Sequence, residues 1–180
     1  MPVVEPPPAA PSKVTSKTVL VIILVVGGAC VLGLGVFAAL AVFGVKKYVN
    51  RAKSAEGSVF VRTLAEGVAR CASVKDPNGE FHGLPESSSP VPSSLSSVSA
   101  KKYQSSAGEW TDPAFSCAAF RMSEPQYFQY RWVRRSPTSG AAVGVADLDG
   151  DGVGELTFEQ AVTCEPAGAC RTGSVSSSAP

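Results

Sequence analysis

Paired catalytic bases and metal-binding histidines are scarce in this sequence. His82 is the only histidine, and the serine-rich stretch over residues 86–100 has no histidine or other paired base beside it. A serine nucleophile needs such a base for activation, so we expect no enzymatic activity. No two cysteines form a CxxC pair. Without that spacing and with one histidine, a structural zinc site is the weaker interpretation of the cysteines.

Charged residues are absent between Val19 and Val45. These 27 residues would form a helix of roughly 40 Å, and a bilayer core needs about 20 residues. A cleavable signal peptide has a shorter apolar region of about 7–15 residues. The sequence therefore predicts a retained transmembrane helix over residues 18–45. Residues 1–17 are proline-rich in their first part and are expected to be a disordered cytoplasmic stub.

Strong net charge is also absent. The chain carries +1 overall, but from Ser54 onward it has 10 Lys and Arg against 14 Asp and Glu, or about −4. A mildly acidic domain has no electrostatic reason to bind nucleic acid, so no such partner is expected. The basic residues after the apolar run outnumber those before it: Lys46, Lys47, Arg51 and Lys53 against Lys13 and Lys17. By the positive-inside rule this would place the C-terminal part in the cytoplasm.

Cysteine usage indicates the opposite compartment. Cys30 lies inside the apolar run, and Cys71, Cys117, Cys164 and Cys170 all follow it. Four cysteines in a small domain suggest two disulfides and an oxidising compartment. Three pairings are possible. We favour Cys164–Cys170, which closes a short loop, and Cys71–Cys117, which would join a helix end to the first strand. The expected location is the cytoplasmic (inner) membrane, with the N-terminus cytoplasmic and the C-terminal domain periplasmic or extracellular.

Residues 46–73 are predicted to continue the helix as an amphipathic segment. The segment has no proline, and its apolar residues follow helical spacing; they include Val49, Phe60, Leu64, Val68 and Cys71. Gly57 and Gly67 should weaken it by roughly 1 kcal/mol each relative to alanine. The helix should end near Ser73, just before the turn sequence KDPNG at residues 75–79.

The remainder is predicted to be a Ser/Pro-rich solvated loop followed by a sheet. The loop covers residues 74–116, the sheet domain 117–172, and a disordered tail 173–180. Expected strands are 117–122, 127–134, 141–146 and 155–160, and Phe128, Tyr130 and Trp132 should share one apolar face. Only the amphipathic helix is large enough to cover that face. The predicted fold is α+β, with a long helix packed on a three- to four-stranded antiparallel sheet.

One candidate site stands out between the last two expected strands. The sequence DLDGDG at residues 147–152 places Asp147, Asp149 and Asp151 at alternate positions, with Val153 and Glu155 following. Alternate carboxylates and the Val153 carbonyl could converge on one hard cation, for which Ca²⁺ is the candidate. Phe158 stands where an EF-hand has its bidentate glutamate, so the loop is not an EF-hand. The alternative is an Asp/Gly turn that needs no metal.

The segment from Ala38 to Glu56, AALAVFGVKKYVNRAKSAE, carries a family likeness. It leaves the apolar run through alanines and enters a basic, aromatic stretch, and together with residues 117–152 it covers about a third of the chain. In both segments the chain resembles type IV pilins and type II secretion pseudopilins, of the myxobacterial kind. The resemblance implies a non-enzymatic subunit or accessory component that contacts other pilins or secretion components. Some pseudopilins also bind calcium in a C-terminal loop.

The chain departs from the pilin pattern at its processing site. Aligned on the family, cleavage would follow Val21, where a glycine is required, and Val26 stands where the family has an assembly glutamate. The resemblance therefore implies an uncut protein that lacks one intersubunit contact. A second hypothesis follows from these departures: a stand-alone, membrane-anchored extracytoplasmic binding module with a calcium-stabilised loop.

Overall fold

The computed structural model describes residues 21, 28, 52–165 and 168–178. The chain divides into two units, Met1–Lys47 and Tyr48–Pro180, and nearly all of the described residues belong to the second. The predicted stub 1–17 and nearly all of the predicted transmembrane segment 18–45 lie outside the described residues. Within the described residues, no helix has the length and apolarity that a membrane crossing requires.

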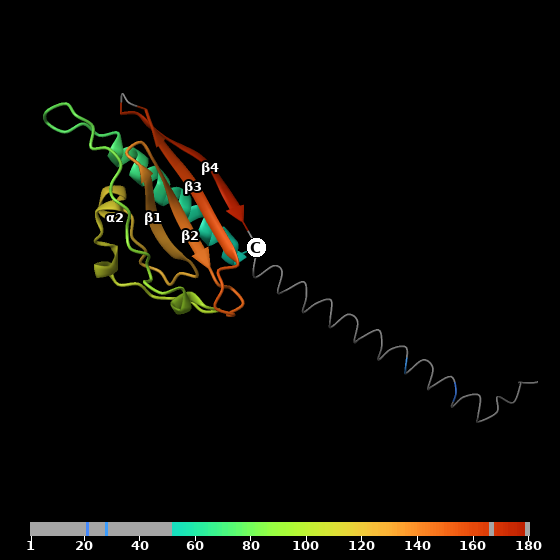
Figure 1. Cartoon of the computed structure of the whole chain (residues 1–180). Coiled ribbons are helices and arrows are strands. Elements are labelled where there is room, and N and C mark those ends of the chain that lie inside the picture. The colour runs from blue at the N-terminus through green and yellow to red at the C-terminus, as the bar shows by residue number, and fades with distance from the viewer. Residues whose placement is uncertain (1–20, 22–27, 29–51, 166–167, 179–180) are drawn as a thin grey trace, which may run out of the picture. The chain divides into compact units, whose positions relative to one another are not determined.

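A helix over residues 52–72 opens the described part of the second unit (Figure 1). One face is buried at helical spacing, as predicted; it comprises Val61, Leu64, Ala65, Val68, Ala69 and Ala72. The helix ends at Ala72, next to the predicted end at Ser73, and its last turn tightens there, since the Ser73 N–H bonds both the Ala69 and the Arg70 carbonyls. The first residues of the predicted 46–73 segment lie outside the described residues.

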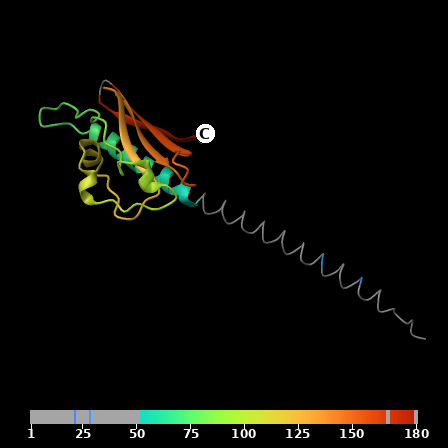
Figure 2. The same ribbon diagram turned by 60° about the horizontal axis from the view of Figure 1, so that its bottom comes forward.

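Four antiparallel strands form the sheet, in the spatial order β1-β2-β3-β4. Their bounds are β1 Gln129–Ser136, β2 Ser139–Ala146, β3 Leu156–Cys164 and β4 Cys170–Ser178. Each pairs with the next along the chain, and the helix lies along one face of this meander in both views (Figures 1 and 2). The α+β prediction of a helix on an antiparallel sheet is confirmed for the described residues.

The helix runs in the same direction as β1 and β3. Near its start, Gly57 lies against Phe128 and Phe158, which stand at the beginnings of β1 and β3. Past its end, the Ser73 Oγ accepts a hydrogen bond from the Cys170 N–H at the start of β4 (3.0 Å). We call the end where the helix, β1 and β3 begin the proximal end, and the opposite end the distal end.

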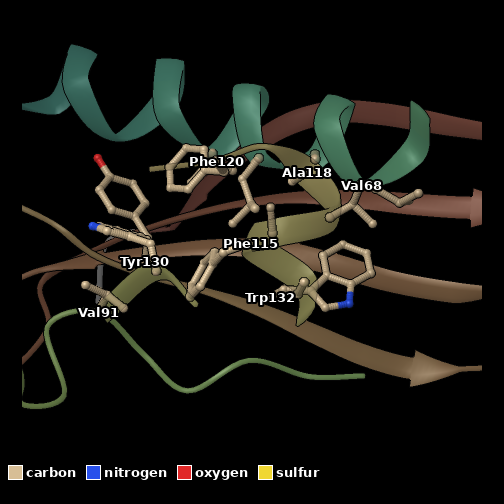
Figure 3. Packing of buried hydrophobic residues seen from close by; sticks show 14 of the residues in the cluster. Val68, Val91, Phe115, Ala118, Phe120, Tyr130 and Trp132 are labelled. Carbon is tan, nitrogen blue, oxygen red and sulfur yellow. The ribbon is translucent and has the colours of Figure 1, made fainter. Parts of the chain in front are cut away.

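Large aromatic side chains fill the space between helix and sheet. Tyr130 and Trp132 in β1 and Phe128 directly before it are fully buried, which confirms the predicted alternation. They meet Val68 from the helix and Phe115 from α2 in a single core (Figure 3). Burying a large apolar side chain contributes roughly 1.5–3 kcal/mol, so this core is the main stabilising feature of the unit.

The core explains the two helical glycines, which the sequence analysis treated only as weak points. A Cβ on Gly57 would stand 2.6 Å from ring carbons of Phe128 and Phe158, and a Cβ on Gly67 would stand 2.5 Å from the Ala118 carbonyl oxygen. Both positions exclude a side chain because another element approaches the helix backbone there. Glycine lowers helix propensity at these sites but permits the close packing.

Two predictions of secondary structure were wrong. Residues 117–122 are no strand, because Pro113–Ala118 form the short helix α2, which begins with a proline and ends at Ala119 in a left-handed conformation (φ 51°). Residues 173–178 of the predicted disordered tail belong to β4. That strand has little apolar alternation; its ladder to β3 and the half-buried Val175 hold it in place.

The predicted solvated loop 74–116 is instead a cover packed against the core. It contains two short 3-10 helices, η1 Leu95–Val98 and η2 Ala107–Trp110, and buries Val91, Val98 and Trp110. Its serine run follows the outer edge of β1. There the Trp132 N–H donates to the Ser88 Oγ and the Arg134 N–H to the Ser87 Oγ, both at 2.8 Å. These hydroxyls satisfy donors that a sheet edge would otherwise leave unpaired.

The disulfides pair as favoured from the sequence. Cys71 at the helix end bonds Cys117, which lies in α2 and not in a strand as expected. Cys164 bonds Cys170 across the turn between β3 and β4. With all four sulfurs in disulfides, the zinc interpretation of these cysteines is wrong.

Candidate metal centre

The acidic loop occupies residues 147–155, between β2 and β3 at the proximal end of the unit. Asp147 directly follows Ala146, the last residue of β2, and Glu155 directly precedes Leu156, the first residue of β3. Because β2 and β3 pair in register at Ala146 and Leu156, the ends of the loop are fixed by the sheet. The Ala100 N–H also donates to the Asp147 carbonyl (2.9 Å), which attaches the segment after η1 to the loop.

Asp147 organises the turn from its base. Its side chain is buried, and its two carboxylate oxygens accept hydrogen bonds from the Gly150 N–H (2.7 Å) and the Gly152 N–H (3.0 Å). Both glycines adopt positive φ, 88° and 91°, a conformation that glycine adopts without strain. The DGDG spacing therefore folds the loop around the Asp147 carboxylate.

The other three carboxylates also accept hydrogen bonds from backbone N–H groups of the loop. The Glu155 oxygens accept hydrogen bonds from the Leu148 N–H (2.8 Å) and the Asp149 N–H (3.1 Å). The Asp149 carboxylate accepts from the Asp151 N–H (3.1 Å), and that of Asp151 from the Val153 N–H (2.7 Å). Each carboxylate is thus oriented by a local backbone donor and keeps further lone pairs for another ligand.

The four carboxylates converge as a cation site requires. One oxygen from each of Asp147, Asp149, Asp151 and Glu155 lies within 4.8 Å of the others. Two oxygens that coordinate the same Ca²⁺ at about 2.3–2.6 Å stand at most about 5 Å apart, and the spacing of these four oxygens is compatible with one shared ion. This cluster could therefore hold a metal ion. The predicted fifth ligand, the Val153 carbonyl, stays a prediction.

The pKa values of two acids in the loop shift in opposite directions. A hydrogen bond from the Ser99 side chain, with the Gly150 and Gly152 N–H groups, lowers the pKa of Asp147 despite its burial. Burial raises the pKa of Glu155, and its side-chain hydrogen bond with Asp149 adds to the effect. A bound cation would oppose this rise, because metal ligands bind in their deprotonated form.

Sequence reasoning missed two groups of residues near this site. Ser99 lies outside the DxDxDG pattern, and only the fold brings it to Asp147. Glu56 accepts a hydrogen bond from the Tyr127 N–H (2.7 Å) and one from the Tyr130 hydroxyl (3.4 Å), which joins the helix to β1 at the same end. The partners are separated by more than 70 residues, so no local pattern could have indicated them.

Comparison with protein-family models, with curated proteins and with solved structures gives no significant match for this chain.

Proposed function

We propose that this protein is a non-enzymatic, membrane-anchored pilin-like subunit or accessory component of a type IV pilus or type II secretion system. The observation that carries the proposal is the helix over residues 52–72, which lays its apolar face along an antiparallel sheet. In sequence this helix begins seven residues after Val45, the end of the charge-free run, and its first residues belong to the segment Ala38–Glu56 that resembles pilins. A membrane helix that becomes the spine of an α+β domain is the arrangement implied by the resemblance.

The proposed location is the cytoplasmic membrane, with a single span and the second unit outside the cytosol. Two disulfides support it, Cys71–Cys117 and Cys164–Cys170, because disulfides persist in oxidising compartments. The heavier basic flank at Lys46 and Lys47 argues for the reverse orientation. We give the disulfides more weight because thiols in the cytosol are kept reduced.

A deletion strain tests the assembly role. Loss of the protein should reduce piliation, motility or secretion, and the full chain should co-purify with inner-membrane components of the same system. Complementation with the intact gene is the control. Normal pili, motility and secretion in the deletion strain would contradict the proposal.

The second candidate is a stand-alone anchored binding module. Val21 and Val26 favour it, because they stand where a pilin needs its cleavage glycine and its assembly glutamate. Purified filaments separate the two candidates. An uncut protein that is absent from filaments, although the same cells make them, indicates the module.

In both candidates we propose that the loop at residues 147–155 binds Ca²⁺. Four convergent carboxylates on a loop held by β2 and β3 support this, and oxygen-only donors suit a hard cation. The ion would neutralise acids crowded at one end of the sheet, and it has no catalytic step to perform there.

Calorimetry of the full chain in detergent tests calcium binding. The wild-type protein should release or absorb heat on calcium addition, and Asp149→Ala should abolish the signal because it removes an exposed ligand. Asp76→Ala is the matched control. The Asp76 carboxylate accepts hydrogen bonds from the Asn78 and Glu80 N–H groups in a similar turn, but that turn lies at the distal end. Equal heats from wild type and Asp149→Ala, or none from either, would contradict the site.

A further inference from the structure

A basic–aromatic cluster lies at the proximal end of the unit. We define it as Lys53, Lys101, Lys102 and Tyr127. The Lys53 and Lys102 ammonium groups lie 4.9 and 5.0 Å from the centroid of the same Tyr127 ring. The two lysines are far apart in sequence, one in the first turn of the helix and one before the bridge that pairs Tyr103 with Gln126. Lys101, the neighbour of Lys102 in sequence, is also exposed.

The lysine charges in this cluster are left largely uncompensated. Among the described residues, the three ion pairs join other side chains, and none includes Lys53, Lys101 or Lys102. A ring face attracts an ammonium group without neutralising it. Glu56 is attracted to Lys102, but this carboxylate is partly buried and its Oε1 accepts a hydrogen bond from the Tyr127 N–H. The cluster therefore keeps positive charge available for an outside anion.

Chain connectivity keeps this cluster close to the end of the apolar run. Lys53 follows Val45 by eight residues, and eight residues span at most about 28 Å even when fully extended. If the apolar run is inserted in a bilayer, Lys53 cannot be far from the headgroup layer. Tyrosine and lysine are the side chains that anchor proteins there, because each combines an apolar body with a polar end.

We propose that the basic–aromatic cluster docks the second unit onto anionic phospholipid headgroups of the membrane that holds the apolar run. The proposal rests on the membrane anchor put forward above. Charge complementarity identifies the partner: lysines near a surface are attracted to anionic lipids but not to zwitterionic ones. Docking would hold the proximal end against the membrane. It would also bring the acidic loop, bonded to Ala100, beside the headgroups.

Hydrogen–deuterium exchange of the full chain in lipid nanodiscs tests the docking. The protein is inserted in discs of phosphatidylcholine alone or with phosphatidylglycerol, in calcium buffer so that the acidic loop is neutralised in both. Peptides spanning residues 99–104 and 124–128 should exchange more slowly in the anionic discs. Removing one lysine should reduce that protection by up to about fivefold, the factor for roughly 1 kcal/mol per lysine at a membrane surface.

Matched lysine variants make the test specific. Lys53→Gln with Lys102→Gln should abolish the lipid-dependent protection. Lys75→Gln should leave it unchanged, although the Lys75 ammonium lies over the Phe81 ring at a similar 5.0 Å, because that pair lies beyond the helix end. Near-native tryptophan fluorescence of the double variant shows that the core around Trp110 and Trp132 is intact.

Three results would contradict the docking. Inserted protein with equal exchange in the two discs, or with protection that survives the double variant, overturns the docking and leaves the anchor standing. Protection that depends on protein concentration and not on lipid charge indicates contact between copies and also overturns it. Flotation of the full chain with lipid vesicles tests the anchor separately. If the chain does not float, both the membrane anchor and the docking are contradicted.

Discussion

Glu56 links the helix to the sheet through one partly buried carboxylate. It accepts hydrogen bonds from the Tyr127 N–H and the Tyr130 hydroxyl. Burial raises the pKa of Glu56, and the Tyr127 N–H and the nearby Lys102 only partly oppose the rise. The folded state thus binds the Glu56 proton more tightly than the unfolded chain does.

The sign of the pH effect at Glu56 follows from that raised pKa. The stability that Glu56 contributes is fully present below its ordinary value of 4.5 and is lost as pH rises through its folded pKa. Glutamine resembles the protonated acid. Relative to wild type, Glu56→Gln should therefore lower the free energy of unfolding less at pH 7 than at pH 4. Denaturant unfolding in detergent, followed by tryptophan fluorescence, measures this. Glu66→Gln, on the exposed face of the same helix, controls for the loss of a carboxylate, and a difference that grew the other way would contradict the assignment.

Gly67 is expected to resist substitution for a different reason. Alanine would gain about 1 kcal/mol in helix propensity, but its Cβ would meet the Ala118 carbonyl oxygen at 2.5 Å. Overpacking typically costs about 1–3 kcal/mol, so Gly67→Ala should destabilise the unit on balance. The free energy of unfolding measures the change. Gly108→Ala, with open space around the added Cβ, should be near neutral, and a Gly67→Ala protein more stable than wild type would contradict the close contact.

At the scale of elements, the two disulfides hold different parts of the fold. Cys71–Cys117 spans 46 residues and joins the helix end to α2, whereas Cys164–Cys170 spans 6 residues within one hairpin. Loop-closure entropy predicts losses of about 4 and about 2 kcal/mol respectively when each bridge is removed. Paired serine substitutions, Cys71 with Cys117 and Cys164 with Cys170, should therefore rank in that order in denaturant unfolding. The reverse order would indicate that attachment of β4 to the helix end governs stability.

Local patterns predicted the elements whose signals lie within a few residues. The alternation around Phe128, Tyr130 and Trp132 predicted β1, and the turn after Ser73 predicted the helix end. The sequence of α2 also contained a usable signal, since Asp112-Pro113 is a common helix start, but the apolar run CAAFRM was read as a strand. The acidic loop was predicted from its DxDxDG spacing, and its carboxylates do converge.

Elements held by distant partners could not be predicted in this way. Residues 172–178 are almost all small and polar, and the register with β3 makes them a strand. The composition of the serine run predicts a solvated loop, yet Ser87 and Ser88 accept hydrogen bonds from the backbone of β1 more than 40 residues away. Hydrogen bonds of this kind depend on tertiary contacts that no local window contains.

At the scale of the whole molecule, we propose an apolar membrane anchor that carries a disulfide-bonded α+β unit outside the cytosol. Two features of that unit lie at its proximal end, the acidic loop and the basic–aromatic cluster. Both disulfides lie at the distal end: Cys71–Cys117 at the end of the helix and Cys164–Cys170 at the turn between β3 and β4.

The intact mass of the native protein, measured from its own membrane with and without reductant, tests this claim most directly. The account predicts a chain that retains the residues before the apolar run and lacks the four hydrogens that two disulfides remove. The mass should rise by those hydrogens on reduction, and Cys30 should be the one thiol that reacts beforehand. A chain cleaved within or before the run, or one with all five cysteines free, would contradict the account.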